Sequence, residues 1–201
     1  MNPLNTVAGT ITAGIVLAVI IAVATTGVVF NAASFIVWIH VLAGITWIGL
    51  LYYFNFVQVP ALADAIADEG GPGGAGITKY VAPRALWWFR WGALLTWLTG
   101  AATLGHYKIF ADAFALGMLG DTPNTQAMVI GVGAWLGTIM LFNVWVLIWP
   151  NQKKVLGIVE ASADEIARAK RVALLASRTN TLLSIPMIMS MVGYGHGGFF
   201  L

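Results

Sequence analysis

The chain has 201 residues, of which 59% are hydrophobic and only 9% are charged, whereas a soluble domain is about 25% charged. This composition is typical of a membrane protein, and a formal net charge of +2 gives no indication of a nucleic-acid partner. Because the chain contains no cysteine, its composition excludes disulfides, thiolate metal sites and a covalently attached haem c.

Five apolar stretches follow one another, each long enough to cross a hydrocarbon core of about 30 Å as a helix. They are residues 7–30, 34–62, 84–106, 126–149 and 171–197. The glycine-rich residues 70–76 predict a flexible surface linker, and the mixed charges of 153–170 predict a solvated connection with a short helix capped by Ser162 or Asp164. We therefore expect an all-α integral membrane protein, a single domain over residues 1–201 built as a bundle of five transmembrane helices.

Lysine and arginine are distributed unequally between the two ends of these five spans. One end holds nine of them, namely Lys79, Arg84, Arg90, Lys153, Lys154, Arg168, Lys170, Arg171 and Arg178. Only Lys108 falls at the other end. Because cytoplasmic flanks are enriched in these residues, the sequence predicts a multi-pass protein of the bacterial inner membrane with a cytoplasmic N-terminus and a periplasmic C-terminus.

All three histidines, His40, His106 and His196, fall near the outer ends of spans in this topology. They are the candidate ligands of a haem b near the outer surface, since two imidazoles on neighbouring helices make a one-electron carrier. For His106 and His196 the alternative is a polar residue at a span end with access to water. His40 lies deeper, where an ionisable group is costly, and this position favours a functional role.

A second polar group gathers in the cytoplasmic half of the predicted bundle. Its candidate substrate-binding residues are Arg90, Asn143, Arg178 and Asn180. The spans contain no Asp or Glu to pair with the two arginines, and an anionic ligand with planar oxygen and nitrogen acceptors would satisfy their guanidinium groups. The alternative is that both arginines extend to lipid headgroups or cytosolic water.

Two further features of the last spans concern packing. Gly131, Gly133 and Gly137 give the fourth span a small face suited to close helix packing or to contact within a homo-oligomer. Pro186 predicts a kink in the fifth span.

Four stretches of the chain resemble, in order, the membrane motifs of the urate oxidase N-terminal family, the membrane part of bacterial cytochrome-c-linked urate oxidase. These are residues 38–49 with 52–54, 89–91 with 96–100, 137–145 with 150–154, and 178–186 with 191 and 196. Members of full length add further spans and a C-terminal cytochrome c domain, for which this chain has no cysteine. Residues 7–30 are an additional first helix.

The resemblance implies a membrane redox protein that passes electrons from a urate-like planar anion through haem b to a separate cytochrome c. Because His40 and His196 lie within the matching motifs, the resemblance implies that both are functional positions. It assigns no role to His106. Two alternatives remain. One is a non-catalytic membrane subunit of a larger respiratory or photosynthetic complex. The other is a haem-binding oxidase similar to the protoporphyrinogen oxidase family, whose helix with an early histidine resembles residues 36–56.

Overall fold

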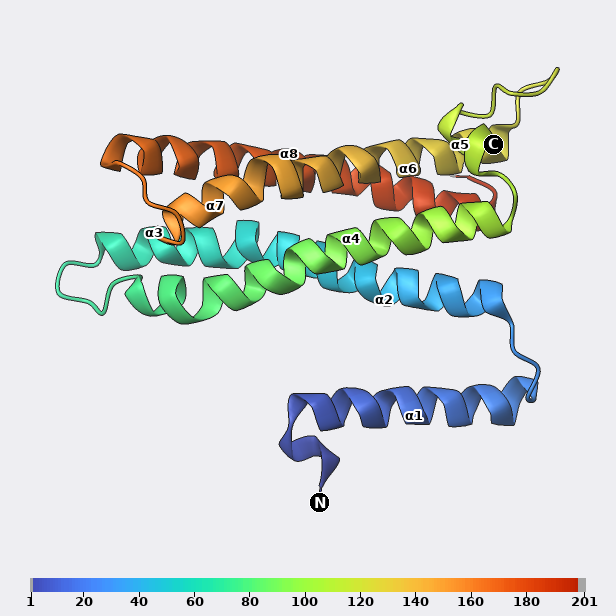
Figure 1. Ribbon diagram of the computed structural model, residues 1–201, viewed down its shortest axis with the longest axis horizontal. Helices are drawn as coiled ribbons and strands as arrows, with labels where there is room; N and C mark the ends of the chain where they lie inside the picture. The colour runs from blue at the N-terminus through green and yellow to red at the C-terminus, as the bar shows by residue number, and fades with distance from the viewer. Residues whose placement is uncertain (1, 199–201) are drawn as a thin grey trace. The chain divides into compact units, whose positions relative to one another are not determined.

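The computed structural model describes residues 2–198, which form helices and connecting loops without β-strands (Figure 1). The chain divides into two compact units, Met1–Ala32 and Ala33–Leu201. The first unit contains a short 3₁₀ helix, η1 (Pro3–Asn5), and the helix α1 (Val7–Thr26). The Thr6 hydroxyl accepts a hydrogen bond from the backbone N–H of Gly9 at 3.0 Å and so caps the start of α1.

The second unit is a bundle of long helices. Its α-helices are α2 (Ala32–Tyr53), α3 (Val59–Ala67), α4 (Ala82–His106), α5 (Phe110–Phe114), α6 (Thr125–Phe142), α7 (Trp149–Val155) and α8 (Ala163–His196). Three π-helical segments adjoin them, namely η2 (Phe54–Gln58), η3 (Ile77–Val81) and η4 (Asn143–Ile148). Because η2 joins α2 to α3 and η4 joins α6 to α7, each of these pairs forms one continuous helix.

Four helices of the described chain are long and apolar enough to cross a membrane. They are Val7–Thr26, Ala32–Ala67, Thr125–Val155 and Ala163–His196. These agree with four of the five predicted spans. The remaining one, α4, is also helical over 25 residues, but Arg90 and several threonines interrupt its apolar stretch.

Each π-helical segment ends directly before a dipeptide whose second residue is proline. In η2 the N–H of Val59, the residue before Pro60, bonds to the carbonyl oxygen of Phe54, five residues earlier. The same arrangement precedes Pro83 and Pro150. Proline has no N–H and its ring clashes with the carbonyl four residues before it, so a wider turn relieves the clash. By contrast, α8 remains α-helical through Pro186.

The main core lies where α2, α4, α6 and α8 meet. Trp47, Phe89 and Met140 are each at most 1% exposed there, and Phe89 packs edge-on against Phe54 with ring centroids 5.4 Å apart. A β-carbon on Gly92 would lie 3.4 Å from the backbone nitrogen of Trp47, so α2 and α4 cross closely at this glycine. Such close packing stabilises helix pairs in lipid, where the hydrophobic effect gives no preference for one apolar contact over another.

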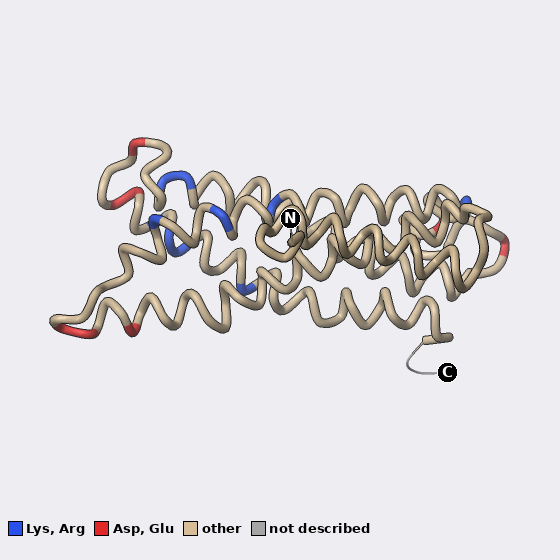
Figure 2. The backbone as a smooth tube through the Cα atoms, turned by 90° about the horizontal axis from the view of Figure 1, so that it is seen from below, with Lys and Arg blue, Asp and Glu red and all other residues tan. Residues whose placement is uncertain are grey.

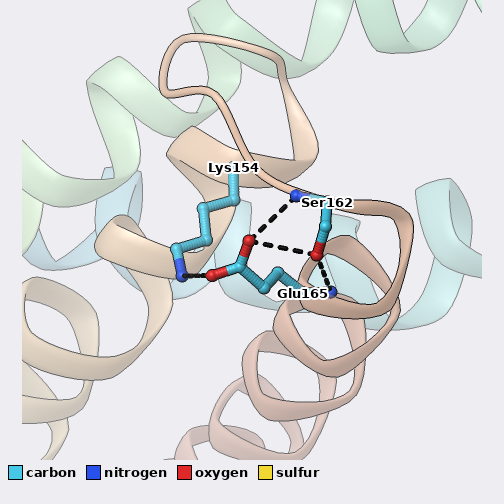
Figure 3. Close-up of polar contacts among 3 residues, drawn as sticks. All are labelled: Lys154, Ser162 and Glu165. Atoms are coloured by element: carbon cyan, nitrogen blue, oxygen red, sulfur yellow. Dashed lines mark hydrogen bonds and ion pairs between the residues drawn. The ribbon is translucent and has the colours of Figure 1, made fainter.

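The connection between α7 and α8 differs from the prediction in one respect. Ser162 is the N-cap, as expected, but it begins the 34-residue α8 and not a separate short helix. Glu165 accepts hydrogen bonds from the N–H and hydroxyl of Ser162 at 2.9 and 3.1 Å, and it lies 3.7 Å from Lys154 (Figure 3). No glycine or proline interrupts residues 163–185, so the capped helix continues directly into the apolar stretch.

Charged residues are concentrated at one end of the second unit. Figure 2 shows most lysines and arginines near the α3–α4 and α7–α8 connections. We call this the basic end. At the opposite end, α2 begins and α4 and α8 finish (Figure 1), so the three histidines belong to that half of the bundle.

Candidate functional site

A cavity of about 570 Å³ lies among α2, α4, α6 and α8, toward the opposite end from the basic one. We call it the His40 cavity. Its wall is largely apolar, and Gly100, Gly133, Gly137 and Gly195 give it four positions without side chains. The volume is within the range of about 300–1,000 Å³ that small-molecule and cofactor sites occupy.

The imidazole of His40 is held in one tautomer by the backbone of α4. Its Nδ1 lies 2.8 Å from the carbonyl oxygen of Thr96 and 3.3 Å from the hydroxyl of Thr99. A carbonyl oxygen can only accept, so Nδ1 carries the proton and donates it. In the neutral ring Nε2 then keeps its lone pair, and no hydrogen bond occupies this atom among the described residues.

Gly100 makes this contact possible. In an α-helix the carbonyl of residue 96 points toward residue 100, so a side chain at that position would cover the oxygen. A β-carbon on Gly100 would lie 3.0 Å from Cε1 of His40 and 3.3 Å from its Nδ1. The glycine therefore leaves the space in which the ring reaches the backbone of α4.

The facing wall comes from α8, which contributes the thioethers of Met187 and Met191. A hydrogen-bonded serine holds this helix against α6. The Ser190 hydroxyl accepts from the N–H of Gly133 at 2.9 Å and donates to the carbonyl oxygen of Val129. Close approach of the two helices is possible because a β-carbon on Gly133 would fall 2.9 Å from that hydroxyl oxygen.

The other two histidines do not line the cavity. His196 is exposed, and its Nδ1 lies 2.9 Å from the carbonyl oxygen of Val192 in its own helix. His106 is also exposed and contacts Tyr107 edge-on, with ring centroids 5.5 Å apart. The described residues contain no group of three or more His, Asp or Glu side chains that could hold a metal ion, so an ion in the cavity would rely on His40 and neutral ligands.

The structure brings together two of the four candidate substrate-binding residues. The Asn143 amide donates to the side-chain oxygen of Asn180 at 2.8 Å, and the Asn180 amide donates to the carbonyl oxygen of Met140 at 3.0 Å. Both asparagines are buried, and Asn180 is 0% exposed. This pair joins the first residue of η4 to the middle of α8.

The two arginines lie apart from this pair. The guanidinium carbon of Arg90 stands 3.6 Å from the ring centroid of Trp149, a close cation–π contact. Its Nη1 is buried and has no hydrogen-bond partner among the described residues. Arg178 is exposed, since two helical residues are separated by about 200° and Asn180 faces α6. None of the four residues lines the His40 cavity.

Sequence reasoning missed a polar contact between α2, η2 and α8. The Tyr52 hydroxyl lies 2.9 Å from that of Ser184, which itself donates to the carbonyl oxygen of Thr181. One turn further on, the Asn55 amide donates to the Ser177 hydroxyl at 2.8 Å. The signal was present, because polar residues at positions 52 and 55, and at 177 and 184, recur at helical spacing on one face.

Comparison with known protein families gives a match over the last part of the chain. The family model described as urate oxidase N-terminal matches residues 112–200, which include α6, α7 and α8. No curated protein and no solved structure matches the chain. The family match is consistent with the resemblance noted in the sequence, and it covers Asn143, Arg178, Asn180 and His196, whereas His40 and Arg90 precede it.

Proposed function

We propose that this protein is a membrane redox protein related to the membrane part of urate oxidase, and that it holds haem b in the His40 cavity. The family match supports the relation, and four apolar helices support a place in the membrane. A bound haem b would supply one-electron transfer at its iron. The residues of this chain would bind the haem, orient it and exclude water from it.

The main support for the haem site is the hydrogen bond that His40 Nδ1 donates to the Thr96 carbonyl oxygen. Histidines that ligate metals almost always donate their other ring nitrogen to a carboxylate, backbone carbonyl or water, which fixes the tautomer. His40 has this arrangement, and its ring belongs to the wall of a cavity of about 570 Å³. The residues present therefore fit a haem ligated through Nε2 of His40.

The proposal assigns His40 as the imidazole ligand ahead of His106 and His196, which are exposed and do not line the cavity. Other side chains in the wall are also of kinds that can ligate haem iron, namely the thioethers of Met187 and Met191 and the phenol groups of Tyr107 and Tyr194. A mostly apolar wall without carboxylates suits the porphyrin ring.

In the proposed topology the basic end faces the cytoplasm of a bacterial inner membrane, since lysine and arginine favour that side. The His40 cavity then lies toward the periplasm. Electrons would leave on that side to a separate cytochrome c.

The proposed electron donor is a urate-like planar anion, on the strength of the family match. Arg90 is the side chain best suited to bind it, because its Nη1 lacks a partner among the described residues and Trp149 already holds the guanidinium plane. The Asn143 amide donates to the side-chain oxygen of Asn180, whose own amide donates to the carbonyl oxygen of Met140. We assign the two asparagines to positioning η4 against α8.

A second candidate function is that of a non-catalytic subunit in a larger respiratory or photosynthetic complex. The Asn143–Asn180 pair favours it, because residues that would bind substrate are engaged in internal packing. A haem-binding oxidase similar to protoporphyrinogen oxidase would share the His40 ligand, and it differs from the first proposal only in its substrate.

Absorption spectra of the detergent-solubilised protein, oxidised and then reduced with dithionite, test the proposal together with haem quantification as the pyridine haemochrome. We expect about one haem b per chain in the wild type and in His106→Ala, and loss of that haem in His40→Ala. Size-exclusion chromatography checks that each variant stays folded. A wild-type spectrum without a haem band would refute the haem site and favour the subunit function.

Addition of urate then distinguishes the urate-oxidising redox protein from the oxidase similar to protoporphyrinogen oxidase. Reduction of the haem by urate in the wild type, abolished in Arg90→Gln while the haem content is unchanged, is expected from the first proposal. Haem that protoporphyrinogen reduces and urate does not would instead favour the oxidase.

A further inference from the structure

A second hollow opens on the surface of the bundle where α2 lies beside η3 and the start of α4. Its volume is about 430 Å³, and the apolar part of its lining includes Leu50, Val81 and Ala85. We call it the Arg84 groove. It is distinct from the His40 cavity, since the two share no lining residue.

One cation, Arg84, is fixed at this groove, and a second, Lys79, precedes it by five residues in the chain. Nη1 of Arg84 donates to the carbonyl oxygen of Tyr80 at 2.7 Å, which holds the exposed guanidinium against the groove wall. Nζ of Lys79 lies 5.3 Å from the ring centroid of Tyr80. Neither cation forms an ion pair with another side chain in the part of the chain that the structure describes. Both remain available to an anion.

The lining residues change in character along the groove. Tyr53, Tyr80 and Arg84 lie nearer the basic end, whereas Leu50 and Trp88 lie one turn further into the bundle. Tyrosine is enriched at the interface between the headgroup and acyl regions of a bilayer. The groove therefore offers a cation at headgroup depth and an apolar surface at the depth of acyl chains.

We propose that the Arg84 groove binds one anionic phospholipid, with its phosphate at Arg84 and an acyl chain along Leu50, Ala85 and Trp88. Basic pockets between transmembrane helices on the cytoplasmic side are suited to anionic headgroups. An apolar lining favours a lipid over a free phosphate, because inorganic phosphate gains nothing from Leu50 or Ala85. The lipid would bridge α2 to η3 and α4, and so stabilise this end of the bundle.

Thermal unfolding in an uncharged detergent, with added phosphatidylglycerol or phosphatidylcholine, tests the proposal. We expect phosphatidylglycerol to raise the Tm of the wild type clearly more than phosphatidylcholine does. Arg84→Gln should lose most of this difference, and Arg84→Lys should keep part of it. Arg171→Gln is the matched control, because Arg171 is an exposed arginine at the same end and does not line the groove.

The Tm of each variant without lipid separates a binding defect from a folding defect. If Arg84→Gln unfolds too early to measure, native mass spectrometry of Arg84→Lys and the wild type gives the count of retained phosphatidylglycerol molecules. Equal losses in Arg84→Gln and Arg171→Gln would overturn the proposal in favour of diffuse charge attraction. Full protection by inorganic phosphate alone would overturn it in favour of a free anion. None of these readouts depends on haem.

Discussion

His40 donates a hydrogen bond from Nδ1 to the carbonyl oxygen of Thr96 at 2.8 Å, across the interface between α2 and α4. Two residues that are far apart in the sequence thus fix one imidazole in the wall of an apolar cavity. The contact depends on the missing side chain at Gly100, which lies one helical turn after Thr96. The candidate site is therefore sensitive to a residue that carries no chemistry of its own.

Replacing Gly100 by alanine should displace the His40 ring, because the new β-carbon would lie 3.0 Å from Cε1. We expect haem content to fall several-fold, and overpacking to lower stability by about 1–3 kcal/mol. Gly105→Ala is the control in the same helix, since its β-carbon would meet nothing within 4 Å. Pyridine haemochrome assays and thermal unfolding measure the two effects. Equal haem in both variants would argue against His40 as the ligand.

Asn180→Ala should destabilise the protein by about 1–3 kcal/mol, because it leaves a buried polar group without its partner. The amide of Asn143 would lose its acceptor and the carbonyl of Met140 its donor. Unfolding in mixed micelles measures the change. Arg178→Ala, at an exposed position in the same helix, should change stability by less than about 0.5 kcal/mol. A large effect of Arg178→Ala would point to a structural role that its exposure does not suggest.

The glycines of α6 should respond to alanine in opposite directions. At Gly131 the β-carbon would collide with the carbonyl of Ala113 in α5, whereas at Gly137 it would meet nothing within 4 Å. We expect Gly131→Ala to destabilise the protein and Gly137→Ala to stabilise the helix by up to about 1 kcal/mol. Comparing the Tm values of the two variants tests whether Gly131 allows α6 to pack closely against α5. Similar Tm values would mean that α5 moves aside readily.

The cap of α8 should make stability depend on pH. Hydrogen bonds from the Ser162 N–H and then its hydroxyl, with Lys154 nearby, hold the pKa of Glu165 below its ordinary value. A lowered folded-state pKa means that the stabilisation is present above the ordinary pKa of about 4.3 and is lost as the pH falls through the folded value. Ser162→Ala should cost about 1 kcal/mol at neutral pH.

Glu165→Gln isolates the carboxylate in that experiment. We expect the Tm of the wild type to approach that of Glu165→Gln as the pH is lowered past about 4.3, while the two differ at neutral pH. A difference between the two Tm values that does not change with pH would show that the ionised carboxylate of Glu165 is not the source of the stabilisation. Thermal unfolding at several pH values provides the measurement.

The sequence alone was sufficient to predict the helices and most of their ends. Apolar length is a local property, and the side-chain caps Thr6, Asn124 and Ser162 act on backbone N–H groups within three residues. The charge asymmetry and the lack of cysteine can likewise be read directly from the sequence. The π-helical segments before Pro60, Pro83 and Pro150 follow from local backbone chemistry too, although the sequence reading placed its one proline effect at Pro186.

The tertiary structure decided which polar residues meet. The depth of His40 in its span already favoured it over His106 and His196, but only packing shows that it alone among them lines a cavity. Likewise Asn143 bonds to Asn180 while Arg178 faces outward. The physical reason is that a helix fixes the angles between its own side chains, whereas its rotation relative to its neighbours is set by contacts between residues remote in sequence.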